Sequence, residues 1–203
     1  MKNLNIDSKK LKLFFNFTIA LFLYGINTSI VNANSLNNVQ EKYIVAKITE
    51  LKDNSGLVYV GALINQADIG VYLQQMQSVV DNKALYQQLR ANQASRDHQS
   101  FHVTLINPYE YQTIKNKVKL GENIRLTLQG LGRVQKNTSV NDPSQSATTT
   151  LQQSYFVVVS SADGQYFRQQ YLLKPKDFHI TLGFNPQDIY DMSKGKERLL
   201  DFN

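Results

Sequence analysis

The sequence contains no cysteine among its 203 residues. This absence excludes disulfide bonds, thiolate zinc sites, cysteine nucleophiles and the acylated cysteine of a lipoprotein. Proline and glycine are also few, at 4 and 10 residues, and charged residues make up only 19% of the chain, which argues against collagen-like and low-complexity chains. Any chemistry must therefore use oxygen or imidazole groups.

Large apolar side chains, by contrast, are plentiful. The hydrophobic content is 42%, and 11 tyrosines and 10 phenylalanines are available to fill an interior. A chain of this length and composition buries one substantial core, so we expect a single globular domain.

The N-terminal 33 residues are typical of an export signal. An apolar stretch at 13–26 (LFFNFTIALFLYGI) is followed by small residues at the spacing that a signal peptidase reads, ending at Ala33. Four lysines precede that stretch: Lys2, Lys9, Lys10 and Lys12. We therefore predict a signal peptide at 1–33, a linker at 34–42, a domain at 43–203, and a periplasmic or secreted protein.

Two other interpretations of this segment stay open, a retained N-terminal anchor and a buried helix. The leader is long, and Asn16 interrupts its apolar part. On the other side, the apolar stretch is too short to span a bilayer comfortably. We expect no stable membrane anchor once the signal has been removed, and a monomeric protein.

The net charge of the mature chain is small. The formal charge of +6 falls to +3 when residues 1–33 are removed, because four lysines and one aspartate leave with them. That charge is too low for an extended phosphate footprint, so we expect no binding of duplex DNA. A small anionic ligand remains compatible with it.

The first half of the mature chain predicts a β-hairpin followed by helix. Residues 43–49 (YIVAKIT) and 57–64 (LVYVGALI) are β-rich runs around a turn signal, DNSG, at 53–56. Apolar residues at helical spacing then extend through 69–89, with a break at Asp81-Asn82. The polar residues 90–99 predict a loop.

The second half predicts four strands with two helices between them. A short helix is expected from Asn107-Pro108 to about residue 118, and another before Pro175. Gly130 and Gly132 indicate a bulge or a close backbone approach, and the polar residues 136–153 predict a long loop. The predicted strands are residues 101–106, 124–134, 155–160 and 178–182.

Two of the three histidines occupy the same local pattern, FHVTL at 101–105 and FHITL at 178–182. Side chains alternate along a strand, so His102 and Thr104 share one face, and His179 and Thr181 do the same on the other strand. Each strand thus presents an imidazole and a hydroxyl about 6–7 Å apart.

A single histidine of this kind is more often a hydrogen-bonded strand residue than a catalyst. The matched pair favours the catalytic interpretation instead, because both histidines have the same pattern of neighbouring residues. The third histidine, His98, lies in a polar stretch and is expected to be exposed. Neither motif brings carboxylates at ligand spacing, so a metal site is the weaker interpretation, and no metal or cofactor is expected.

Other residues have two interpretations each. Tyr59, Tyr109 and Tyr155 are either base-stacking side chains or core residues. The basic residues Arg125, Arg133 and Lys136 either contact a phosphate or belong to a solvated strand face.

The paired motifs resemble those of the 2H phosphoesterase superfamily, whose members carry two His-hydrophobic-Ser/Thr-hydrophobic motifs. The surrounding segments FHVTLINPYEY, LQGLGR and KPKDFHITLGFNPQDIYD resemble its Swiss Army Knife RNA repair-like branch, over about residues 43–203. This resemblance implies an α+β fold of two lobes, with two pseudo-symmetric antiparallel sheets and outer helices around a central groove. It also implies metal-free hydrolysis or transesterification of phosphodiesters, typically 2′,3′-cyclic or 2′-5′ linkages.

Elementary chemistry agrees with that implication. One imidazole, His102 or His179, deprotonates water, and the other protonates the leaving oxygen, because an unperturbed pKa near 6.5 lets both forms exist near neutral pH. Thr104 and Thr181 would hold the phosphate oxygens. We predict an exported phosphodiesterase acting on small nucleotides or RNA ends. The alternatives are a nucleotide-binding module without turnover, and a structural protein whose groove is vestigial.

Overall fold

The computed structural model describes residues 41–140 and 148–202. The predicted signal peptide and most of the predicted linker lie outside the described residues. Within the described part of the chain, no helix is long and apolar enough to cross a membrane.

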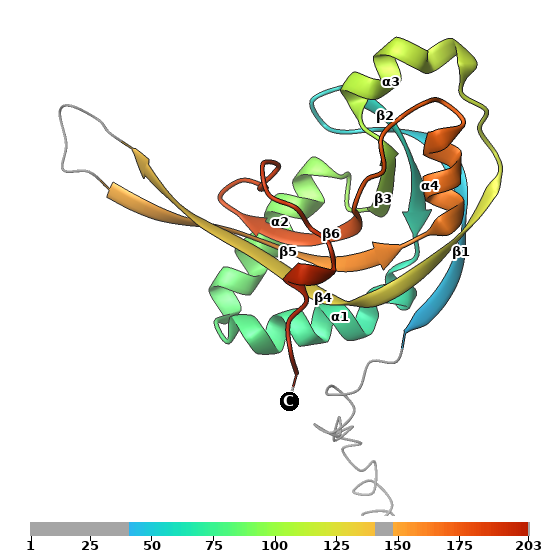
Figure 1. The fold of residues 1–203 in the computed structure, drawn as a ribbon. Coiled ribbons are helices and arrows are strands. Elements are labelled where there is room, and N and C mark those ends of the chain that lie inside the picture. Colours follow the sequence, from blue (N-terminus) through green and yellow to red (C-terminus); the bar gives the residue numbers. More distant parts are fainter. Residues whose placement is uncertain (1–40, 141–147, 203) are drawn as a thin grey trace, which may run out of the picture. The chain divides into compact units, whose positions relative to one another are not determined.

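Six antiparallel strands form one closed sheet in the order β1-β2-β3-β6-β5-β4 (Figure 1). The α+β class is confirmed, but the expected division into two sheets is not. Strand β1 pairs with β4 over six residues, and β3 meets β6, so the edges of the two halves are joined. The strands are β1 (Lys42–Lys52), β2 (Val58–Ile64), β3 (Phe101–Ile106), β4 (Asn123–Val140), β5 (Thr148–Ser160) and β6 (Phe178–Asn185).

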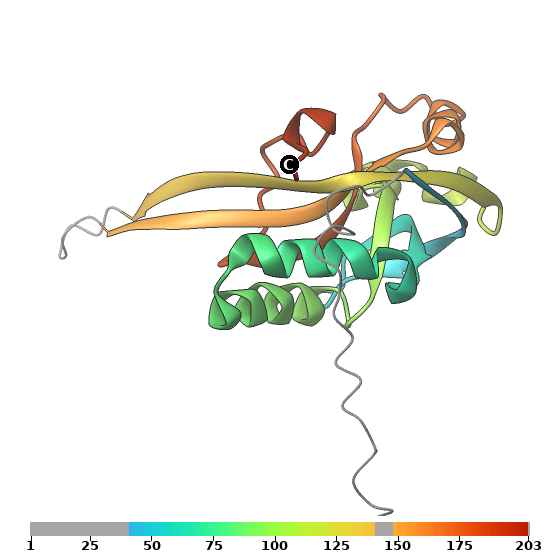
Figure 2. The same cartoon turned by 90° about the horizontal axis from the view of Figure 1, so that it is seen from below.

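The two halves of the sheet repeat the same order of elements. In the first half, α1 (Gln66–Val80) and α2 (Lys83–Arg96) connect β2 to β3, and in the second, α4 (Ala162–Gln169) connects β5 to β6. Figure 2 shows α1 and α2 side by side, on one side of the β4–β5 ribbon. The strand that ends each half is the one that carries a histidine motif.

The hairpin between β1 and β2 forms where the turn signal predicts it. The carboxylate of Asp53 accepts the backbone N–H groups of Ser55 and Leu57, both at 2.9 Å. Gly56 has a φ of +91°, a conformation that glycine adopts without steric cost. The aspartate and the glycine together fix the hairpin that pairs β1 with β2.

The break between α1 and α2 also lies where the sequence indicates it. Asp81 adopts a φ of +45° at the end of α1, and the Asn82 side chain accepts the N–H of Leu85 at the start of α2. An asparagine cap of this kind satisfies one of the free donors of the first turn.

The predicted loop at 90–99 is wrong for residues 90–96, because α2 continues to Arg96, whereas residues 97–99 form a turn. The polar side chains there find partners inside the protein instead of water. Gln93 is fully buried, and its amide donates to the Asp97 carboxylate at 3.0 Å and to the Ser100 carbonyl at 2.7 Å. Burial with paired hydrogen bonds makes a polar stretch compatible with a packed helix.

After β3, the chain enters α3 (Pro108–Ile114) through a capping box. Asn107 accepts the N–H of Glu110 at 2.9 Å, and Glu110 accepts the N–H of Asn107 at 3.0 Å. A short 3₁₀ turn, η2 (Lys115–Lys117), follows. The predicted short helix is thus confirmed.

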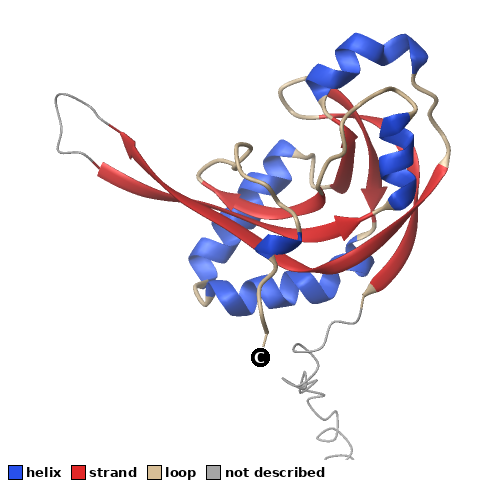
Figure 3. Cartoon of the chain, viewed as in Figure 1, coloured by secondary structure: helices blue, strands red, loops and turns tan. Residues whose placement is uncertain are grey.

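The predicted long loop at 136–153 is wrong for the part that the structure describes, residues 136–140 and 148–153. The β4–β5 ladder continues outward to the pair Val140↔Thr148, and Figure 3 shows this ribbon extending beyond the helices. Threonine is β-branched and favours extended backbone, which explains how a polar segment such as Thr138 paired with Thr150 continues the strands. Residues 141–147 lie outside the described residues.

Apolar side chains of all six strands and of the helices form the main core. A second, smaller cluster lies on the other side of β4 and β5, where Phe156 and Val158 pack against Ile189 of the C-terminal segment. Gly132 makes this possible, because it bridges to Leu199 and a Cβ there would lie 2.6 Å from the Phe156 ring. The predicted close backbone approach at this glycine is confirmed.

Candidate active site

The two motif strands meet directly. Val103 of β3 is the register partner of Ile180 of β6. Continuing this antiparallel register by one residue sets His102 against Thr181 and Thr104 against His179. The two histidines are then diagonal neighbours on one face, with their Cα atoms about 7–8 Å apart.

The opposite face of both strands belongs to the core. Phe101, Val103, Phe178 and Ile180 are at most 3% exposed and lie in the main cluster. Both histidines and Thr104, by contrast, are only partly buried, whereas Thr181 is 7% exposed. The alternation expected from the sequence therefore holds.

His102 has a hydrogen-bonding partner on the neighbouring strand. Its Nε2 lies 3.1 Å from the hydroxyl of Tyr59, and the two rings are 5.2 Å apart between centroids. Burial lowers the pKa of His102, the Asp97 carboxylate opposes this change, and Arg96 and Lys176 reinforce it. The ring is thus oriented by Tyr59 and is more easily deprotonated than a free imidazole.

His179 has a more apolar and more positive environment. The edge of Phe156 packs against it with ring centroids 5.7 Å apart, and its Nδ1 is buried with no hydrogen-bond partner among the described residues. Burial, followed by the nearby charge of Lys194, lowers the pKa of His179 well below 6.5. This imidazole is therefore neutral near neutral pH.

Two cations act on both rings. After burial and the nearest charges, Arg96 and Lys176 each contribute to lowering the pKa of His102 and of His179. One pair of side chains influencing both imidazoles indicates a single site, to which each half of the sheet contributes one histidine.

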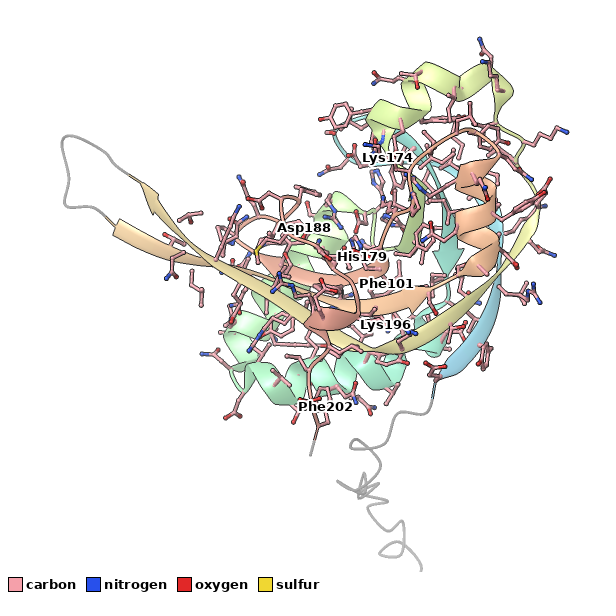
Figure 4. All side chains as sticks on the ribbon, viewed as in Figure 1. Phe101, Lys174, His179, Asp188, Lys196 and Phe202 are labelled. Carbon is pink, nitrogen blue, oxygen red and sulfur yellow. The ribbon has the colours of Figure 1, made fainter. Side chains whose placement is uncertain are left out.

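A buried carboxylate, Asp188, organises the positive side of this site. It accepts hydrogen bonds from Lys194 Nζ at 2.7 Å, from an Arg96 guanidinium nitrogen at 2.6 Å and from Ser154 Oγ at 2.7 Å. Burial alone would raise the pKa of Asp188, but Lys194 and Arg96 hold it well below its usual value. Figure 4 shows Asp188 beside His179.

Sequence reasoning missed most of this surrounding shell. Arg96 fell in the segment predicted to be a loop, and Lys194 was not singled out. Lys176 and Asp188 lie in a segment that resembles the family, but the sequence alone predicted no role for either residue. Tyr59 was interpreted as either a base-stacking or a core residue, and its contact with His102 depends on how β2 pairs with β3.

The remaining predictions divide between the core and the surface. His98 is exposed, as expected. Tyr155 lies in the main core, whereas Tyr109 is 73% exposed. Arg125 and Lys136 form ion pairs with Asp163 and Asp191, and Arg133 lies over the Tyr155 ring.

The arrangement favours acid and base chemistry at an anion. Within residues 41–140 and 148–202, no three histidine or carboxylate side chains gather so as to hold a metal ion. What the two strands do present is a pair of imidazoles and a pair of hydroxyls on one face, with Arg96 and Lys176 close by. Such a set can bind a phosphate and move protons on two sides of it.

Comparison with known proteins identifies one family. Residues 69–190, more than half of the chain, match the family model described as Swiss Army Knife, 2H phosphoesterase domain. Both histidine motifs, Arg96, Lys176 and Asp188 fall inside this range, whereas Tyr59 and Lys194 fall outside it. No curated protein and no solved structure matches the chain.

Proposed function

The chain belongs to the 2H phosphoesterase superfamily, and we propose that it is a metal-independent phosphodiesterase that hydrolyses 2′,3′-cyclic or 2′-5′ phosphodiester bonds of small nucleotides or RNA ends. Its family makes it a hydrolase acting on phosphoester bonds. The observation that supports the finer proposal is the direct pairing of β3 with β6, which brings the two motifs to one face.

His179 takes the role of general base in this proposal. Its pKa is lowered further than that of His102, so its imidazole is neutral and able to accept a proton from the attacking water. As the water oxygen forms its bond to phosphorus, this proton moves to His179. The buried, unpartnered Nδ1 leaves Nε2 as the nitrogen that faces the water.

His102 takes the role of general acid. Asp97 partly opposes the effect of burial on its pKa, and a bound phosphate anion favours its protonated form further. The protonated ring donates its proton to the ribose oxygen as the bond from phosphorus to that oxygen breaks. The two proton transfers balance, and the product is a phosphomonoester.

Thr104 and Thr181 hold the phosphate between the rings. Each hydroxyl lies beside the histidine of the other strand by register, so it can donate to a non-bridging oxygen. Arg96 and Lys176 supply positive charge without forming part of the proton pathway. Donors placed where negative charge develops lower the barrier of such reactions.

The predicted signal peptide places this activity outside the cytoplasm, in the periplasm or the surroundings of the cell. Intact intracellular RNA is not available there, so small nucleotides and released RNA fragments are the substrates that we favour. The protein would act as a monomer, since both motifs come from one chain.

Hydrolysis of 2′,3′-cyclic nucleotides by the mature protein tests this proposal. The variants His102→Ala and His179→Ala should each lower kcat about 10²–10⁴-fold, and EDTA should leave the rate unchanged. His98→Ala, at the exposed histidine, is the matched control and should retain full activity. Full activity in both motif variants contradicts the proposal, and tight nucleotide binding without product supports a binding module instead.

A further inference from the structure

A cavity of about 280 Å³ lies next to the β6 motif but contains none of the four polar side chains of the two motifs. It is bordered by Val158, the register partner of His179, and by Phe178, which precedes His179 in the chain. Its remaining walls come from β4, from the start of α4 and from the C-terminal segment. The cavity therefore adjoins the β6 motif at the end of the strand where His179 lies, within the second half of the sheet.

Two lysines line this cavity, Lys176 and Lys196. Among the described residues, no carboxylate forms an ion pair with either Nζ. The one carboxylate on the wall, Asp177, accepts a hydrogen bond from Ser193 at 2.8 Å. The cavity thus has more positive charge than its own residues neutralise.

The position of Lys176 is fixed by its backbone. Gln165 accepts the N–H of Lys176 at 3.2 Å and donates to its carbonyl at 2.6 Å. The lysine is partly buried, and this burial, followed by the charge of Arg168, lowers its pKa to about 8. A lysine held in this way without a counterion gains from an anion that enters the cavity.

The lining of the cavity also includes a hydrogen-bond acceptor. The Oε1 atom of Gln129 is buried and has no hydrogen-bond partner among the described residues. A ligand that brings both an anionic group and a hydroxyl or amino donor would satisfy the lysines and this amide together. A phosphorylated sugar has both, and its size suits a cavity near the lower end of the ~300–1,000 Å³ range of small-ligand sites.

We propose that the cavity lined by Lys176, Lys196 and Gln129 is a subsite for a second phosphate of the substrate, one that is not hydrolysed. This inference rests on the proposed function, since it extends the same groove. The preferred substrate is then a cyclic phosphodiester that carries a further phosphate on the same nucleoside or on the preceding nucleotide. Simple cyclic mononucleotides are the poorer substrates.

Kinetic comparison of two matched substrates tests the subsite. Adenosine 2′,3′-cyclic phosphate and its 5′-phosphorylated form differ only in the second phosphate. The wild-type protein should show a kcat/KM about tenfold or more higher for the 5′-phosphorylated substrate, because a charged hydrogen bond to a lysine is among the stronger polar contacts. Lys196→Gln and Lys176→Gln should each reduce the ratio of the two kcat/KM values toward one.

Lys174→Gln is the matched control. Lys174 is exposed in the loop that follows α4, and Figure 4 shows it apart from His179 and Lys196. Its substitution should leave the ratio as in the wild-type protein. Equal kcat/KM values for both substrates, or a preference that persists in both Lys196→Gln and Lys176→Gln, would overturn the subsite while leaving the proposed function intact.

The subsite can be separated from the reaction itself. If neither substrate is hydrolysed, the proposed function fails. Titration calorimetry with adenosine 3′,5′-bisphosphate still measures the affinity of the cavity for a phosphorylated ligand. Binding that weakens about tenfold in Lys196→Gln and Lys176→Gln, but not in Lys174→Gln, supports the subsite. Equal affinity in all four proteins, or no binding to any of them, contradicts it.

Discussion

The two halves of the sheet carry the same motif in different surroundings. In the β1–β2–β3 half, His102 contacts the polar hydroxyl of Tyr59. In the β4–β5–β6 half, His179 lies against the edge of Phe156, with Lys194 and Asp188 close by, and no described residue hydrogen-bonds to its Nδ1. A repeated motif therefore does not give two equivalent imidazoles.

The difference has a structural origin in the C-terminal segment. Residues 186–200 return over β4 and β5, where Ile189 seals the small second core and Asp188 collects Lys194 and Arg96. The small second core takes its apolar residues from the second half of the sheet and from this segment. Burial and, after it, Lys194 of this segment lower the pKa of His179 further than that of His102, as separate acid and base roles require.

The largest effect is expected from removing the charge of Asp188, which holds the C-terminal segment in place. Asp188→Asn leaves Lys194 and Arg96 buried without their shared carboxylate, and should lower the free energy of unfolding by about 3–5 kcal/mol. Urea denaturation measures this change. Asp191→Asn, at the exposed carboxylate that pairs with Lys136, is the control and should change stability little; equal losses in the two variants would contradict the buried cluster.

The next largest effects are expected at Thr104 and Thr181, which allow the two halves of the sheet to be compared directly. Thr104→Val and Thr181→Val keep the shape of the side chain but remove its hydroxyl, and each should lower kcat about 10²–10³-fold. The serine variants at the same positions keep a hydroxyl and should recover most of the rate. A valine variant as active as its serine counterpart would show that this half contributes no donor to the phosphate.

The pH dependence of kcat/KM sharpens the difference between the rings. The productive free enzyme has a neutral His179 and a protonated His102. Both pKa values are lowered from 6.5. Raising the pH above the pKa of His102 deprotonates the general acid, and lowering the pH below the pKa of His179 protonates the general base. The optimum should lie below pH 6.5, with slopes of about tenfold per pH unit on either side, whereas an optimum above pH 7 disagrees with these roles.

The smallest effect is expected at Tyr59. Tyr59→Phe removes one hydrogen bond to His102, which should reduce kcat about 2–12-fold. The alkaline limb of the pH profile should shift to higher pH, since the lost hydroxyl favours the neutral ring, while the acidic limb from His179 stays in place. Tyr109→Phe, at a 73% exposed tyrosine, is the control, and a shift of the acidic limb instead would reverse the assignment of acid and base.

Local pattern was enough to predict the inner part of each strand and which side chains of the two motifs share a face. The alternation of FHVTL and FHITL fixes which side chains share a face, and the DNSG and Asn-Pro signals lie at turns and caps that the structure confirms. In these places the determining interactions are between residues close in sequence.

The errors arose where distant residues decide the structure. Residues 90–96 are helical although they are polar, because the buried amide of Gln93 reaches Asp97 and Ser100. Cross-strand pairing makes strands of residues 136–140 and 148–153. Arg96 and Asp188 are 92 positions apart in the sequence, so no local pattern predicts their ion pair.

The central claim is that the two halves act on one phosphorus atom. A crystal structure with a uridine–vanadate complex, whose five-coordinate vanadium imitates the phosphorus during hydrolysis, tests it most directly. We predict a nitrogen of His102 and a nitrogen of His179 at about 2.7–3.2 Å from the two apical oxygens, with both threonine hydroxyls on the equatorial oxygens. Vanadate held by only one of the two rings, or bound away from both, would contradict the account.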